Sequence, residues 1–197
     1  MKVEKKEVNA IVLDVLMKGH MDDPRPQFKR EPVVQAVGLE QFKLLELIPK
    51  PGVVINLHDK VYIGDSERDK IERVKRRISY DELTPTAKGE LPFMIEQIVK
   101  EREPDFVTFF NKAISITPKL HMLHLLPGIG KKLMWEVLES RNRKPFESFV
   151  ELSERVKLLP DPHRVIVERI MEELDGTSKY YLFVKSVPRS GPYGSEK

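Results

Sequence analysis

Short runs of β-branched and aliphatic side chains dominate the first third of the chain. They occupy residues 8–17, 32–39, 42–49, 53–58 and 61–64, and turn-forming residues separate several of them. No helical period long enough for a crossover connection lies between these runs. The pattern therefore predicts an antiparallel sheet of four or five short strands that curls into a small barrel.

The segment that follows has a different period. Ile71, Val74 and Ile78 recur at helical spacing, and Ser66 is a residue type that caps helices. We therefore expect a basic helix over residues 66–78, with its apolar side on the core and its cations outside.

A polar loop is expected at residues 19–30, between the first two strands. In a five-stranded OB-type barrel such loops border the ligand face, where Phe28 would suit base stacking. The alternative is a solvated loop and a solvated helix face. The loop and the basic helix together supply a possible second basic surface, whose members are Arg68, Arg73, Arg76, Arg77, Arg25, Lys29 and Arg30.

From residue 84 onward the spacing is helical. Thr84-Pro85, Glu103-Pro104 and Thr117-Pro118 each have the form of a helix start, and we expect Pro92 to break or kink the first helix. A buried stripe is expected in the second helix at Phe106, Phe109, Phe110 and Ala113. Further helices are expected at about 131–141, 146–156 and 162–174. The helix at 131–141 would use Leu133, Met134, Trp135, Val137 and Leu138 as its apolar side.

One more strand is expected late in the chain, at about residues 179–185, and we expect it to return to the barrel. The fold class is therefore α+β. The expected division is an OB-like barrel with a basic helix at 1–83, a helical domain at 84–176, the C-terminal strand at 177–187 and a flexible tail at 188–197.

Two glycines flank Ile129 in the turn before the helix at 131–141. Because glycine has no Cβ, Gly128 and Gly130 permit positive φ and close approach of another backbone. Their N–H groups, and those that open the following helix, can point at a phosphate oxygen. Such a site contacts sugar and phosphate, so it is largely independent of base sequence. The alternative is that the glycines serve only the turn. The candidate binding residues are Pro127, Gly128, Ile129, Gly130, Lys131 and Lys132.

The turn has a partner later in the chain. Pro160 follows Pro127 by 33 residues, and each precedes an amphipathic helix. The later turn, Pro160-Asp161-Pro162, has no glycine, and its prolines have no N–H. Asp161 would also repel a phosphate. We therefore expect the second turn to serve packing and not binding.

The charge distribution follows this division. The chain has 197 residues and a net charge of +3, and residues 115–197 hold 14 Lys and Arg against 11 Asp and Glu. The excess positive charge therefore lies with the candidate binding module. There is no cysteine, which excludes thiolate metal sites and a cysteine nucleophile. No signal peptide or membrane span is evident, so we expect a cytoplasmic protein.

Enzyme motifs are not evident. The sequence contains no P-loop, dinucleotide fingerprint, nucleophile elbow or zinc motif. His121 and His124 stand three residues apart, a spacing that can bind metal on a helix, but no further ligand lies beside them. We therefore expect no catalytic residues, no metal site and no enzymatic activity.

These residues carry a resemblance. Leu126-Pro127-Gly128-Ile129-Gly130-Lys131 resembles the hairpin of helix-hairpin-helix proteins, and residues 117–175 resemble a tandem pair of such motifs. The whole chain also resembles an uncharacterised archaeal family of predicted RNA-binding proteins, which join an OB-like barrel to this module. The resemblance implies backbone binding through the amides of Gly128 and Gly130. It allows a monovalent cation held by hairpin carbonyls and implies no other cofactor.

The sequence thus favours a non-catalytic, monomeric protein that binds nucleic acid, RNA in preference to DNA, through the phosphate backbone. An alternative is a protein-interaction scaffold in a ribonucleoprotein or repair complex. A metal-dependent nuclease is a third possibility, although no cluster of acidic residues nominates a site.

Overall fold

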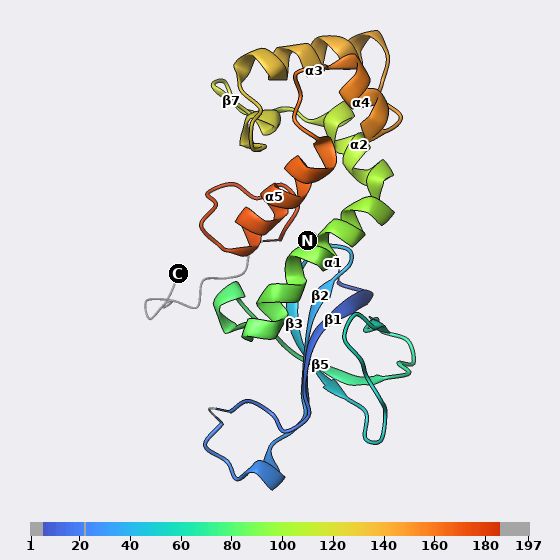
Figure 1. Ribbon diagram of the computed structural model, residues 1–197, viewed down its shortest axis with the longest axis vertical. Helices are drawn as coiled ribbons and strands as arrows, with labels where there is room; N and C mark the ends of the chain where they lie inside the picture. Colours follow the sequence, from blue (N-terminus) through green and yellow to red (C-terminus); the bar gives the residue numbers. More distant parts are fainter. Residues whose placement is uncertain (1–5, 22, 186–197) are drawn as a thin grey trace. The chain divides into compact units, whose positions relative to one another are not determined.

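A computed structural model describes residues 6–21 and 23–185. Contacts divide the chain into two compact units, one from the N-terminus to Leu91 together with the residues from Glu173 onward, the other Pro92–Glu172. The first unit contains a five-stranded antiparallel sheet in the order β4-β1-β2-β3-β5. The strands are β1 Asn9–Leu16, β2 Val33–Gly38, β3 Leu44–Pro49, β4 Lys60–Tyr62 and β5 Ile71–Arg77 (Figure 1).

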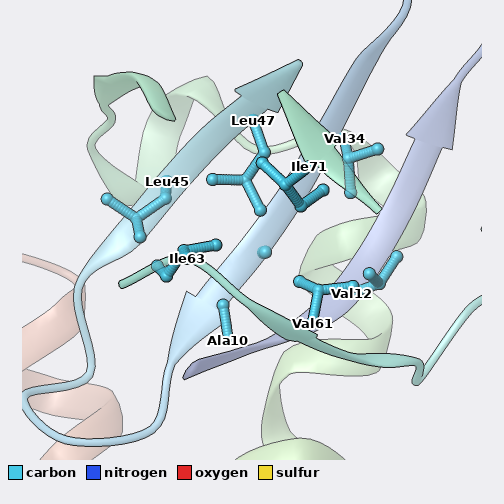
Figure 2. Packing of buried hydrophobic residues seen from close by; sticks show 9 residues of the cluster. Ala10, Val12, Val34, Leu45, Leu47, Val61, Ile63 and Ile71 are labelled. Atoms are coloured by element: carbon cyan, nitrogen blue, oxygen red, sulfur yellow. The ribbon is translucent and has the colours of Figure 1, made fainter. Parts of the chain in front are cut away.

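The sheet curls around its own core as a half-barrel. Apolar side chains from all five strands, or from residues directly beside them, meet in one buried cluster (Figure 2). Within the described residues β4 and β5 each pair with one neighbour only, so the half-barrel is open between them. The cluster comprises Ala10, Val12, Val34, Ala36, Leu45, Leu47, Val61, Ile63 and Ile71.

The expected basic helix is wrong, because Ile71–Arg77 is strand β5. The pairing with β3 explains the misleading period. Ile71 lies opposite Pro49 and Val74 opposite Leu47, with a register shift between them. The extra residue of this bulge turns the two-residue repeat of a strand into a three-residue interval, which imitates a helix.

The strand expected at residues 53–58 is also wrong. That segment is a loop, and β4 pairs with β1 instead. The Asp59 carboxylate accepts the backbone N–H of Asn56 at 3.1 Å, and His58 adopts a φ of 66°. These local turn interactions take the polar groups that a hairpin ladder would need.

Helix α1, Pro85–Glu101, runs without interruption through Pro92, so the expected break is wrong. The cap at its start is confirmed, since the Thr84 hydroxyl accepts the N–H of Ala87 at 3.1 Å. Leu91 and Ile95 are fully buried. Burial of the helix's apolar side outweighs the cost of a proline within it, which is about 3 kcal/mol.

The second unit is mostly helical. The helices expected after Glu103 and at 131–141, 146–156 and 162–174 are confirmed, but the one expected after Thr117-Pro118 is wrong. In its place stand two short paired strands and a single 3₁₀ turn. The Thr117 hydroxyl accepts the N–H of Lys119 at 3.3 Å, so this threonine closes a tight turn and does not cap a helix. The elements are α2 Glu103–Lys112, β6 Ser115–Thr117, β7 Leu120–His121, η3 Met122–Leu125, α3 Lys131–Arg143, α4 Phe149–Arg155 and α5 Pro162–Leu174.

Residues 179–185 belong to the same compact unit as the sheet, but they do not form the expected strand. The described residues of 179–185 contain no strand. The buried Glu173 carboxylate instead accepts the N–H groups of Leu182, Phe183 and Val184 at 2.7, 2.9 and 2.8 Å. One carboxylate therefore accepts the backbone N–H groups that a strand would donate to a neighbouring strand. The expected tail at 188–197 lies outside the described residues.

Candidate nucleic-acid interface

The turn before α3 requires a glycine at position 128. Gly128 has a φ of +75°, a conformation that side chains with a Cβ rarely adopt. A Cβ at this position would also lie 2.9 Å from Cγ of Pro160. The two turns of the sequence repeat therefore lie against one another, and Gly128 is the residue that permits the contact.

The rest of the turn presents backbone to solvent. Ile129 points inward and is only 4% exposed, and its N–H reaches the Leu126 carbonyl at 3.2 Å. Gly130 follows as the N-cap of α3, and its carbonyl accepts the N–H of Met134 at 3.0 Å. Nothing lies within 4 Å of the place where a Gly130 Cβ would stand, so another molecule can approach here.

The start of α3 leaves its donors free. Among the described residues, no acceptor pairs with the backbone N–H groups of Gly130, Lys131, Lys132 or Leu133. The first turn of the helix also holds no acidic residue. Free N–H groups at the positive end of a helix dipole form a site that favours an anion.

The two lysines reinforce this character. Both side chains are exposed, and Lys132 makes one loose ion pair with Glu136 at 3.9 Å. Within the described residues Lys131 has no ion pair. Beside the turn, the acidic Glu172 is already paired with Arg169 at 3.3 Å. Gly128, Gly130, Lys131 and Lys132 of the predicted set are therefore exposed together at this turn, whereas Ile129 is buried.

The second turn has a different arrangement. The Asp161 carboxylate accepts the N–H of His163 at 3.0 Å, and its carbonyl accepts that of Val165 at the same distance. The chain's own carboxylate thus fills the position that an external anion would take at α5.

The members of the expected second basic surface come from the loop at 19–30, from strand β5 and, for Arg68, from the segment before that strand. Several of its arginines are paired. Arg25 binds the Asp23 carboxylate at 2.7 Å, and this hydrogen bond holds the pKa of Asp23 well below its usual range. Arg73 pairs with Glu31 at 3.2 Å.

The remaining members of this surface also make internal contacts. Arg76 lies between the carboxylates of Glu82 and the buried Glu46. Arg30, Arg68 and Arg77 each donate to backbone carbonyls, and Lys29 lies over the Phe28 ring. These contacts neutralise or occupy much of the positive charge that the sequence suggested.

His121 and His124 belong to no candidate metal cluster among the described residues. The described residues contain no cluster of three or more His, Asp or Glu side chains placed to hold a metal ion. The Nδ1 atom of His121 instead accepts the N–H of Leu123 at 3.1 Å. No helix in the described part of the chain is long and apolar enough to cross a membrane.

Trp135 is the residue whose position the sequence missed. The spacing predicts that it packs on the apolar side of α3, but its side chain is 58% exposed. Its spacing of four residues from Lys131 is the signal that places both on one face of the helix.

Comparison with known proteins gives the family. A model of the family described as "Protein of unknown function (DUF655)" matches residues 6–185. The chain belongs to this family. It is 50% identical to the uncharacterized protein MJ0038 of Methanocaldococcus jannaschii over 186 residues, which are 93% of this chain and 82% of that protein.

A solved structure extends the likeness to three dimensions. The crystal structure of Af1531 from Archaeoglobus fulgidus, titled with the same family, is 47% identical in sequence and matches with a TM-score of 0.82. The match covers 91% of this chain and 100% of that chain. The half-barrel followed by helices is therefore a fold that this archaeal relative shares.

Proposed function

We propose that the protein binds nucleic acid, RNA in preference to DNA, through the phosphate backbone and without catalysis. The observation that carries the proposal is the free set of N–H groups from Gly130 to Leu133 beside two exposed lysines. A phosphate oxygen would accept from these donors at the positive end of α3, and Lys131 and Lys132 would supply the attraction. No base edge takes part in this contact, so the binding is independent of sequence.

The fold also supports a more specific proposal about the two units. The two turns, Pro127–Gly130 and Pro160–Pro162, touch through Gly128 and Pro160. This contact fits a tandem helix-hairpin-helix module in which a single 3₁₀ turn stands for the first helix. The curled five-stranded sheet fits an OB-like barrel, a fold that binds oligonucleotides elsewhere.

The test is a binding titration at several salt concentrations. Fluorescence anisotropy of labelled RNA and DNA oligonucleotides gives the affinity, and its dependence on salt gives the number of phosphates contacted. The Lys131→Glu/Lys132→Glu variant should bind more weakly and reduce the salt slope by about two, about one for each lysine lost.

Lys100→Glu/Lys112→Glu is the matched control. Lys100 and Lys112 are exposed residues of the same unit, placed on other helices, and their replacement changes the net charge equally. The control should bind better than the hairpin variant and retain more of the wild-type slope. Equal loss in both variants would mean that net charge, and not the hairpin, governs binding.

A further inference from the structure

A pocket of about 510 Å³ lies beside the turn that precedes α3, within the second unit. One wall belongs to α3 and includes Lys131, Trp135 and Leu138. The other includes Lys119 and His121, from the β6–β7 hairpin that replaces the expected helix. Figure 1 labels β7 and α3, the elements on its two sides. The volume is within the range of sites that hold small organic ligands.

An aromatic ring is available in this pocket. Trp135 lines it and remains 58% exposed, although Met134 and Val137 on the same helix are buried. It is also the one tryptophan in the sequence. A flat ring with an accessible face is the group on which nucleobases stack, whatever their sequence.

The charge of the pocket has a single sign. Lys119 and Lys131 are exposed residues from opposite walls, and among the described residues neither forms an ion pair. No Asp or Glu lines this part of the described surface. An anionic ligand would therefore meet two cations and no repelling carboxylate.

His121 and His124 add polar groups to the pocket. Burial, followed by the nearby Arg141 and His124 side chains, lowers the pKa of His121. The Nε2 atom of His124, which also lines the pocket, is buried with no partner among the described residues.

We propose that this pocket takes one unpaired nucleobase, stacked on Trp135, while the adjoining phosphate lies on the N–H groups at the start of α3. Lys131 belongs to both sites and joins them. This inference rests on the proposed function and narrows it, because it makes single-stranded nucleic acid the preferred ligand.

The choice of single strand over duplex follows from access to the base. A base inside a duplex is stacked and paired, and turning it outward costs a few kcal/mol before the pocket can hold it. A base in a single strand has no such cost. RNA and DNA share this chemistry, so the same sequence is tested with both sugars.

The experiment uses the full chain and two simultaneous readouts. Anisotropy of an end-labelled oligonucleotide reports binding, and fluorescence excited where only tryptophan absorbs reports Trp135 alone. Single-stranded RNA and DNA should quench the tryptophan with the same midpoint as the anisotropy change. A duplex of the same sequence, a strand with abasic sites and inorganic polyphosphate should each bind with little quenching.

Substitutions at two positions on opposite walls test the assignment. Trp135→Ala should weaken single-strand binding about tenfold, the loss expected for one base stack, and leave polyphosphate binding unchanged. Trp135→Phe should restore most of the affinity. Lys119→Glu should weaken single-strand binding without touching the helix. The side chains of Trp135 and Lys119 are exposed, so neither change removes a core contact.

The outcomes separate the two proposals. If oligonucleotides bind but the tryptophan does not respond, or if Trp135→Ala binds the single strand as tightly as the wild type, the pocket assignment is overturned and the hairpin function stands. If no RNA, DNA or polyphosphate binds at low salt, the proposed function itself is overturned. Quenching that requires bases and is lost with the abasic strand supports the pocket.

Discussion

Helices α3 and α5 begin in the same way along the backbone but differ in what occupies their first amides. Gly130 and Asp161 are the two N-cap residues, and each carbonyl accepts the N–H of the fourth helix residue, Met134 or Val165, at 3.0 Å. At α5 the Asp161 side chain also accepts the N–H of His163, whereas Gly130 has no side chain to offer. One helix start is therefore closed by the chain itself, and the other is open.

The comparison indicates that the two turns of the repeat have different roles. An N-cap carboxylate stabilises its own helix but occupies the site of a foreign anion. A glycine stabilises the helix less and leaves the site free. The second turn also packs against the first, since Pro160 lies against Gly128.

The largest effect is expected from Gly128→Ala, which attacks the contact between the two turns. The φ of +75° and the 2.9 Å approach of Pro160 leave no unstrained place for a methyl group. We expect the free energy of unfolding to fall by about 3 kcal/mol, the sum of backbone strain and overpacking. Urea denaturation measures it.

Gly89→Ala is the control for this change. Gly89 lies within α1, and no atom approaches its absent Cβ within 4 Å. The same substitution should there raise stability by about 0.5–1 kcal/mol, because alanine favours a helix. If both substitutions shift stability in the same direction, the turn contact is not what requires Gly128.

The next effect concerns binding. Gly130→Asp converts the open helix start into a closed one like that of Asp161. The new carboxylate would accept the N–H groups that a phosphate needs, so we expect affinity for RNA to fall about 30-fold, equivalent to about 2 kcal/mol. Stability should rise by about 0.5 kcal/mol, because aspartate is a better N-cap and favours the helix dipole.

Opposite signs for binding and stability distinguish this result from damage to the fold. Asn142→Asp, at the other end of α3, changes the net charge equally and should alter affinity by less than about threefold. If Gly130→Asp binds RNA like the wild type, the free N–H groups at this helix start do not contact phosphate.

Sequence patterns predicted the fold where side-chain burial alone decides it. Strands β2 and β3 are wholly buried and β1 is buried over half its length, and their apolar runs predict them directly. The sequence pattern gave wrong predictions where local hydrogen bonds or β-bulges change the spacing of the apolar residues. The bulges of β5 imitate a helix, and the hydroxyl of Thr117 closes a turn at a position typical of a helix cap.

The sequence predicted those parts of the candidate site that depend on residue type, but not those that depend on how distant segments are arranged. The glycines of the first turn and the carboxylate of Asp161 act through backbone geometry, which residue type reveals. The pairing of Arg73 with Glu31, across 42 positions, depends on strand arrangement and could not be seen. The exposure of Trp135 likewise depends on the β6–β7 hairpin, which was expected to be a helix.

A third set of amides, in the unit with the sheet, extends the comparison. The buried Glu7 carboxylate accepts the N–H groups of Glu40, Gln41 and Lys43 at 2.8–3.1 Å. Like Asp161, Glu7 fills a turn with the chain's own carboxylate. It differs in burial, which raises the pKa of Glu7 to about 7, helped by a hydrogen bond with the Glu40 carboxyl.

This pKa gives stability a definite dependence on pH. A folded-state pKa above the ordinary value of 4.5 means that Glu7 contributes stability below about pH 4.5 and loses it as pH rises through 7. Glu40, with a lowered pKa, changes its contribution only below about pH 4.5, so it leaves the trend between pH 5 and pH 8 to Glu7. We expect the free energy of unfolding to fall by about 2 kcal/mol from pH 5 to pH 8, and Glu7→Gln to flatten this trend. Urea midpoints that rise over this range would contradict the assignment.

The smallest effect is expected from Asp161→Ala, which opens the second turn without changing the first. Loss of the N-cap hydrogen bond to His163 should lower stability by about 1 kcal/mol, and Asp161→Ser should restore most of it. Affinity for RNA should stay within about twofold of the wild type, because Pro160 and Pro162 still offer no N–H to a phosphate. A tenfold change in affinity in either direction would show that the second turn also faces the ligand, and that the division between an open and a closed helix start does not hold.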